Sequence, residues 1–151
     1  LTVSADGAVP VHYRVADGST EDSTTHRATW DLLCQLAGRT DFLYVADSKL
    51  CTHDNLTHIT NGGGHFLTIL PRTRKEDGDF RSWIQTHGVD WVLVRHQIGR
   101  DGQPDASLMA EAPWPSAEGY RVVWVLSTAK ARRDADRRRS CIAHASTRLE
   151  D

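Results

Sequence analysis

Short apolar runs separated by polar turns dominate the first part of this chain. The run at residues 42–46 is apolar or aromatic throughout and ends on a single carboxylate, Asp47. A run so short, and rich in aromatic and β-branched side chains, predicts a strand buried on both faces rather than a helix. Side chains at the carboxyl end of such a strand emerge from the core into a crevice. Asp47 is therefore a candidate metal ligand or general base, and a helix N-cap or turn residue is the alternative.

A strand–helix–strand unit is predicted around this run. Thr52 is placed to cap a helix that carries Leu56 and Ile59 and stops at three consecutive glycines. Residues 66–70 then form another short apolar run, closed by a proline. A strand, a helix and a strand in this order predict a βαβ crossover, and therefore a parallel pair of strands inside a mixed sheet.

The residues before this unit predict a hairpin followed by a helix. Residues 1–5 and 9–15 alternate apolar and polar positions around a turn, which predicts two antiparallel strands, the second of them half-buried. Ser19 or Thr20 is then expected to cap a helix that Gly38 ends. The apolar stripe of this helix consists of Ala28, Leu32, Leu33 and Leu36, with Trp30 flanking it.

The second half of the chain is richer in charge and in strand patterns. Residues 72–81 are expected to form a charged loop that contains Gly78, and a proline-rich break follows at residues 113–115. Residues 129–151 are expected to form a strongly basic helix with a modest apolar seam. The expected strands are residues 91–94, 108–112 and 120–126, and the seam residues are Ile142, Ala145 and Leu149.

Composition limits the classes of function that fit the chain. With 151 residues, of which 39% are apolar and 25% charged, it suits one soluble domain with a real core. Because the net charge is −2, nucleic-acid binding would depend on a local patch. No apolar run of about 18 residues and no signal-like leader is present, so no membrane partner is expected. Three cysteines at unrelated spacings fit reduced thiols in a cytoplasm.

Two further groups of residues have both a binding and a structural interpretation. The group that superficially suggests a zinc site is Cys51, His53, His58 and His65. His53 and His58 are five residues apart, however, so they do not share a helical face as i,i+4 ligands would. The second group consists of tryptophans, which could stack on nucleic-acid bases but are more typical of the core of a small β-rich insertion. Its members are Trp83, Trp91, Trp114 and Trp124.

Several segments form a combined pattern through their order and spacing. They are residues 17–22, 44–50, 66–72, 118–121 and 130–139, and they run through nearly the whole chain. No single segment is specific. Together they resemble the DDE transposases of bacterial insertion sequences, in the branch whose RNase H-like core is interrupted by a β-rich insertion.

The resemblance implies metal-dependent cleavage and transfer of DNA strands in transposition. In that family three acidic residues hold two divalent metals, which polarise the scissile phosphate and activate the attacking oxygen. Asp47 matches the second of the three, and hard oxygen ligands select Mg²⁺ or Mn²⁺. The resemblance implies that the first aspartate lies on a strand upstream of this chain and the glutamate on a helix downstream of it. Neither Asp6, a turn residue, nor Glu150 matches these two ligands. The chain alone is therefore expected to be inactive.

The expected fold class is α/β, in the form of an α+β mixed sheet. It comprises an incomplete RNase H-like core at residues 1–71, a β-rich insertion at residues 72–128 and, at residues 129–151, a basic helix that leads back toward the core. The expected partners are transposon-end DNA and, in the intact enzyme, a second copy in a homodimer.

Clustered basic side chains neutralise phosphates, which makes several residues candidates for contact with DNA. These candidates are Lys49, Arg72, Arg74, Lys130, Arg132, Arg133 and Arg137. Asp134 and Asp136 interrupt the basic helix, so a solvated helix with i,i+4 ion pairs is the alternative there. Two other functions also stay open: a non-catalytic DNA-binding or dimerising remnant, and a small α/β metal-binding domain whose likeness to transposases is superficial.

Overall fold

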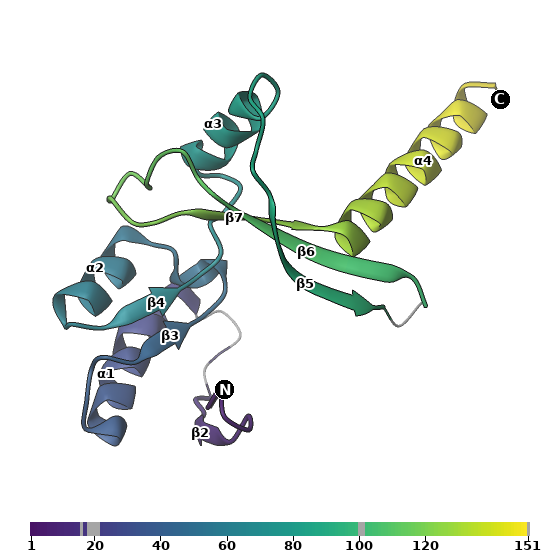
Figure 1. Ribbon diagram of the computed structural model, residues 1–151. Coiled ribbons are helices and arrows are strands. Elements are labelled where there is room, and N and C mark those ends of the chain that lie inside the picture. Colours follow the sequence, from purple (N-terminus) through teal and green to yellow (C-terminus); the bar gives the residue numbers. More distant parts are fainter. Residues whose placement is uncertain (16, 18–21, 100–101, 151) are drawn as a thin grey trace. The chain divides into compact units, whose positions relative to one another are not determined.

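The computed structural model describes residues 1–151 except 16, 18–21, 100–101 and 151. The chain divides into two compact units, Leu1–Pro71 and Arg72–Asp151, which are described separately below. Helices and short sheets alternate in a mixed α+β arrangement (Figure 1). Within the described ranges, no helix has the length and apolarity that crossing a membrane requires.

The first unit opens with the predicted hairpin. β1 (Thr2–Val3) pairs antiparallel with β2 (Pro10–His12), which confirms the pairing. The expectation of a half-buried second strand is wrong, because Val11 is 45% exposed and Tyr13 75% exposed. The alternation in the sequence is real, but no second layer in the described part of the chain covers its apolar side.

α1 (His26–Ala37) follows a short 3₁₀ turn, η1 (Asp22–Thr25). The expected cap at Ser19 or Thr20 lies outside the described residues. Gly38 ends the helix in the left-handed region (φ 65°), as predicted. The prediction that Trp30 only flanks the apolar stripe is wrong. Trp30 is only 4% exposed and is the buried anchor of α1, whereas Leu36 of the predicted stripe is 63% exposed.

The predicted βαβ unit is confirmed. β3 (Leu43–Val45), α2 (His53–Asn61) and β4 (His65–Leu67) follow one another, and the two strands run parallel with Tyr44 beside Phe66. These strands form a two-stranded sheet of their own among the described residues, not part of a mixed sheet. Burial on both faces is also wrong: Tyr44 is 7% exposed, but Leu43 and Val45 are 57% and 62% exposed.

α2 and the glycines after it hold the first unit together. The Thr52 hydroxyl accepts a hydrogen bond from the Asn55 amide (3.3 Å), which confirms the predicted cap, and Leu56 and Ile59 are buried. A β-carbon at Gly62 would overlap the indole ring of Trp30, and one at Gly64 would come within 2.8 Å of it. The glycine run therefore lets α1 approach the end of α2 closely.

The second unit begins with a helix where a charged loop was expected at residues 72–81. α3 spans Lys75–Trp83. Glu76 and Asp77 lie in its first turn, where the helix dipole favours acidic side chains, and Asp77 pairs with Arg81 one turn later (2.6 Å). Phe80 is buried. The charges that suggested a loop are the ones that stabilise this helix, and Gly78 is tolerated inside it.

A three-stranded antiparallel sheet and a long helix complete the second unit. The strands are β5 (Val92–Ile98), β6 (Pro104–Glu111) and β7 (Val123–Ser127), in that order across the sheet. β6 is longer than the strand predicted at 108–112, and β7 begins three residues later than predicted. α4 (Thr128–Glu150) follows directly and packs against β6 and β7, leading outward from the sheet (Figure 1).

The close approach of Trp30 to the glycine run predicts the effect of a single methyl group. Gly62→Ala is expected to destabilise the chain by about 1–3 kcal/mol, because the buried indole must move. The φ of −78° at Gly62 suits any residue, so the effect is steric. Gly78→Ala is the control, because a β-carbon there meets nothing within 4 Å. Alanine has the higher helix propensity, so this variant should be more stable than the natural chain by about 0.5–1 kcal/mol. Urea unfolding measures the free energy of unfolding of both variants. A Gly62→Ala chain as stable as the natural chain would contradict the close packing of Trp30 against the glycines.

Candidate functional site

Asp47 stands at the carboxyl end of β3, where the sequence placed it. Its side chain is exposed and accepts a hydrogen bond from the Lys49 amide (2.9 Å), so it caps the short 3₁₀ turn η2 (Ser48–Leu50). Its backbone carbonyl accepts a hydrogen bond from the hydroxyl of Thr68, just past β4 (2.6 Å). The structural alternative, an N-cap, is thus present. A cap and a ligand role are compatible, because the carboxylate remains open to solvent.

A histidine that sequence reasoning missed lies near Asp47. His26, the first residue of α1, has its Nδ1 3.1 Å from the hydroxyl of Tyr44 on β3. Its Nε2 is buried and has no hydrogen-bond partner in the described part of the chain. Burial lowers the pKa of His26, and the charges of Asp47 and Asp22 oppose that shift. Nothing local signals this pairing, because it joins residues of α1 and β3 across the fold.

The acidic residues around Asp47 do not converge. Among the described residues, no three His, Cys, Asp or Glu side chains lie close enough together to hold a metal ion. The role of Asp47 as a metal ligand therefore stays a prediction, and a two-metal centre would need carboxylates beyond those that the structure groups together.

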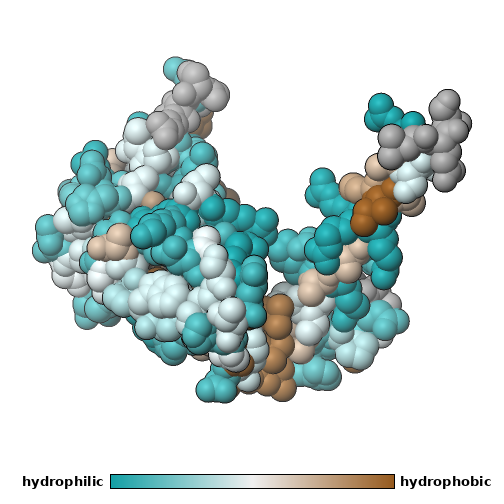
Figure 2. Space-filling view, turned by 90° about the horizontal axis from the view of Figure 1, so that it is seen from above, coloured by the Kyte–Doolittle hydropathy of each residue, from teal (hydrophilic) through white to brown (hydrophobic). Residues whose placement is uncertain are grey.

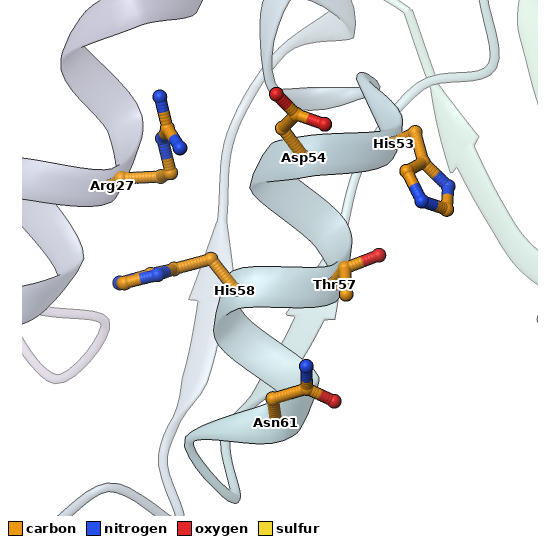
Figure 3. Close-up of a pocket in the computed structure, with 6 residues that line it drawn as sticks. All are labelled: Arg27, His53, Asp54, Thr57, His58 and Asn61. Atoms are coloured by element: carbon orange, nitrogen blue, oxygen red, sulfur yellow. The ribbon is translucent and has the colours of Figure 1, made fainter.

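The candidate zinc residues are spread over different environments. Cys51 is buried at the start of α2, and His65 is exposed on β4. The Nε2 of His58 is 2.7 Å from a carboxylate oxygen of Asp31 on α1. His53 and His58 both line one shallow pocket, but His58 points toward α1 while His53 points away from it (Figure 3).

That pocket combines one arginine, two imidazoles and several neutral or acidic groups. Its lining residues are Arg27, His53, Asp54, Thr57, His58 and Asn61. The side chains drawn in Figure 3 diverge from one another rather than aim at a common point. The arrangement offers no set of donors that would enclose a small ligand.

Arg74, a candidate for DNA contact, is engaged within its own unit. Its guanidinium binds Glu76 (2.7 Å) and Glu118 (2.8 Å), and all three side chains are at least four-fifths buried. Glu76 also accepts a hydrogen bond from the Ala117 amide (3.0 Å), and Ser116 donates to Glu118. The hydrogen bond from Arg74 lowers the pKa of Glu76 to about 2. This network fastens the start of α3 to the loop between β6 and β7.

The basic residues of α4 divide into tethered and exposed ones. Lys130 pairs with Asp134 (3.1 Å), Arg132 donates to the carbonyl of Pro104 (2.8 Å), and Arg139 pairs with Asp136. The i,i+4 pairing expected as the alternative is therefore present. Arg133 and Arg137 are exposed, one turn apart on the same side of the helix.

Lys49 and Arg72, the remaining candidates for phosphate contact, are both exposed. Lys49 lies two residues past Asp47 in the first unit, and Arg72 begins the second. Their part in DNA binding stays a prediction.

The tryptophans of the second unit pack against other rings. Trp124 stacks on Phe80 of α3 with ring centroids 3.7 Å apart, and Trp83 meets Trp114 edge to face at 6.1 Å. These contacts join α3 to the sheet and to the loop before β7. They favour the core interpretation over base stacking, while Trp91 is only half-buried.

Comparisons with known proteins add no assignment: no family model, no curated protein and no solved structure matches this chain.

The buried network predicts a pH-dependent loss of stability in one variant. Arg74→Gln is expected to lower the free energy of unfolding near neutral pH by about 2–3 kcal/mol, because it leaves two carboxylates without their cation. The pKa of Glu76 is about 2 in the folded state and near 4.5 when unpaired, so its stabilisation is complete above pH 4.5 and fades as the pH falls toward 2.

The difference in the free energy of unfolding between Arg74→Gln and the natural chain should therefore shrink as the pH falls from about 4.5 toward 2. Urea unfolding at several pH values measures it. Arg72→Gln, which alters an exposed arginine two residues earlier, should stay within about 0.5 kcal/mol of the natural chain. A difference that is unchanged at low pH would contradict the role of Glu76.

Proposed function

We propose that this chain is part of a DDE-type transposase and supplies one aspartate, Asp47, of its metal site. The chemistry is metal-dependent cleavage and transfer of DNA strands, carried out with further acidic ligands on an RNase H-like core. The 151 residues by themselves would be inactive, because one carboxylate cannot hold two metals.

The observation that carries this proposal is the position of Asp47. An exposed carboxylate ends the first strand of a parallel βαβ unit, beside the end of the neighbouring strand. Ligand sites of α/β sheets lie at this edge, outside the carboxyl ends of the strands. An oxygen ligand there suits Mg²⁺ or Mn²⁺.

The metal role of Asp47 predicts where a weakly bound paramagnetic ion will be found. Low concentrations of Mn²⁺ should broaden the NMR signals of residues 46–50 first. Asp47→Asn should remove that broadening while keeping the turn, because asparagine caps as well as aspartate. Affinity should be about 1 mM or weaker, as expected of a single carboxylate.

Asp41→Asn is the matched control for this experiment. Asp41 is an exposed aspartate at the opposite end of the same strand and pairs with Arg39 (2.7 Å). This variant should keep the broadening at residues 46–50. Equal broadening in the Asp47 variant, or broadening centred elsewhere, would remove the basis of the proposed metal site.

The second candidate function is a non-catalytic remnant that binds DNA or dimerises, and the exposed arginines of α4 favour it. Arg133 and Arg137 could contact phosphates without any metal. Binding that requires Mn²⁺ would support the catalytic proposal, whereas binding in the presence of a chelator would support the remnant.

The exposed arginines predict a salt-dependent affinity for duplex DNA. The double variant Arg133→Gln/Arg137→Gln should weaken binding uniformly across sequences and reduce the slope of log K against log salt by about 2. Fluorescence anisotropy at several salt concentrations gives that slope. Arg14→Gln, an exposed arginine of the first unit, should leave it unchanged. A slope that is the same in all three proteins would exclude this face of α4 as the contact.

A further inference from the structure

β5 is the most exposed strand that the structure describes in the second unit. Each residue from Val92 to Ile98 is exposed, whereas the central strand β6 is mostly half-buried. Four of these side chains are large and apolar, with exposed fractions of 52–65%: Val92, Leu93, Val94 and Ile98. Figure 2 shows hydrophobic surface that lies open among hydrophilic surface. Apolar side chains grouped in this way on one exposed strand are typical of a surface that binds another molecule.

The main chain of β5 also has a free edge. The order of strands across the sheet is β5, β6, β7, so β5 pairs with β6 on one side, and no described strand pairs with its other side. An open edge presents a row of amide and carbonyl groups that an extended segment of another chain can pair with. The geometry therefore favours an extended peptide over a helix as the occupant.

One cation lies at the middle of this edge strand. Arg95 is exposed, and no ion pair joins it to another side chain in the described part of the chain. Both acids of β6 are engaged elsewhere, because Asp105 accepts a hydrogen bond from the Ala129 amide (3.1 Å) and Glu111 pairs with Arg121. A carboxylate on an added strand would supply the missing counter-charge, since opposite charges across a strand pair stabilise the pairing.

The same features oppose pairing of β5 with an identical strand. A twofold antiparallel pairing over the whole strand would set Arg95 against its own counterpart, and like charges directly opposite destabilise a strand pair. The register with β6 shifts between Leu93 and Arg95, which marks a β-bulge. Bulges and charged side chains protect edge strands from self-association. Nucleic acid fits less well than a peptide, because phosphate contact requires clustered cations and this strand is mainly apolar.

We propose that the free edge of β5 binds an extended peptide segment of another protein by strand addition. The peptide carries a carboxylate opposite Arg95 and apolar side chains at the neighbouring positions. This interaction goes beyond the proposed function and uses residues of the second unit alone, so it holds whether or not Asp47 binds a metal.

The first test uses two fluorescent peptides in which threonine and valine alternate around a central glutamate or lysine. The whole natural chain should bind the glutamate peptide about threefold to tenfold more tightly than the lysine peptide, as measured by fluorescence anisotropy. Arg95→Glu should reverse this preference. Arg14→Glu, which changes an exposed arginine of the first unit, should keep it. Failure of the natural chain to bind the glutamate peptide, or a preference that survives Arg95→Glu, overturns the proposal.

The second test distinguishes strand addition from contact through side chains alone. N-methylation of alternate residues removes the amide donors along one edge of the glutamate peptide. One of the two alternating patterns should abolish binding, and the other should leave it intact. Amide hydrogen exchange at residues 92–98 should slow when the unmodified peptide binds. Equal affinity of the two methylated peptides, or unchanged exchange in β5, contradicts strand addition.

Competition experiments examine the other occupants of this edge. Neither duplex DNA nor a rise in the concentration of the chain itself should displace the bound glutamate peptide. Displacement by duplex DNA would assign the edge to nucleic acid, and displacement by the chain would assign it to a second copy. Either result would overturn the proposal.

Discussion

The packing of Trp30 against the glycine run is the contact on which the first unit depends. It brings α1 against the end of α2, and α2 is the crossover that joins β3 to β4. With the indole and the helices covering one side of the two strands, Tyr44 becomes buried and its hydroxyl meets His26. The carboxyl end of β3, and with it Asp47, is positioned by this chain of contacts.

The second unit rests on a different kind of interaction. Arg74 joins two carboxylates from α3 and from the loop before β7, and stacking of Phe80 on Trp124 joins the same helix to the sheet. The side chains of the charged network are largely buried, and Phe80 of the ring stack is buried as well. Together they hold a highly charged segment as a helix against the sheet.

The charged residues of the chain fall into two groups, those paired within the fold and those left exposed to solvent. Some charged side chains form ion pairs within the fold, as do Arg74 and the paired acids of α4. Others stay exposed, as with Asp47, Arg133 and Arg137. Only this second group is available for a metal or for phosphate, and burial and pairing decide which group a residue joins. The proposed metal chemistry draws on the exposed group.

The local elements could be predicted from the order of residues alone: the βαβ unit, the Thr52 cap, the end of α1 at Gly38, the strands of the sheet and the long basic helix. Each follows from spacing and caps within a few residues. Other features could not be predicted, because they depend on contacts between distant segments: Trp30 is a buried anchor, Arg74 is engaged in ion pairs, and residues 75–83 form a helix. The exposure of Leu43 and Val45 is a further example. Burial and ion pairing depend on which distant segments come into contact, and the local pattern of residues does not predict those contacts.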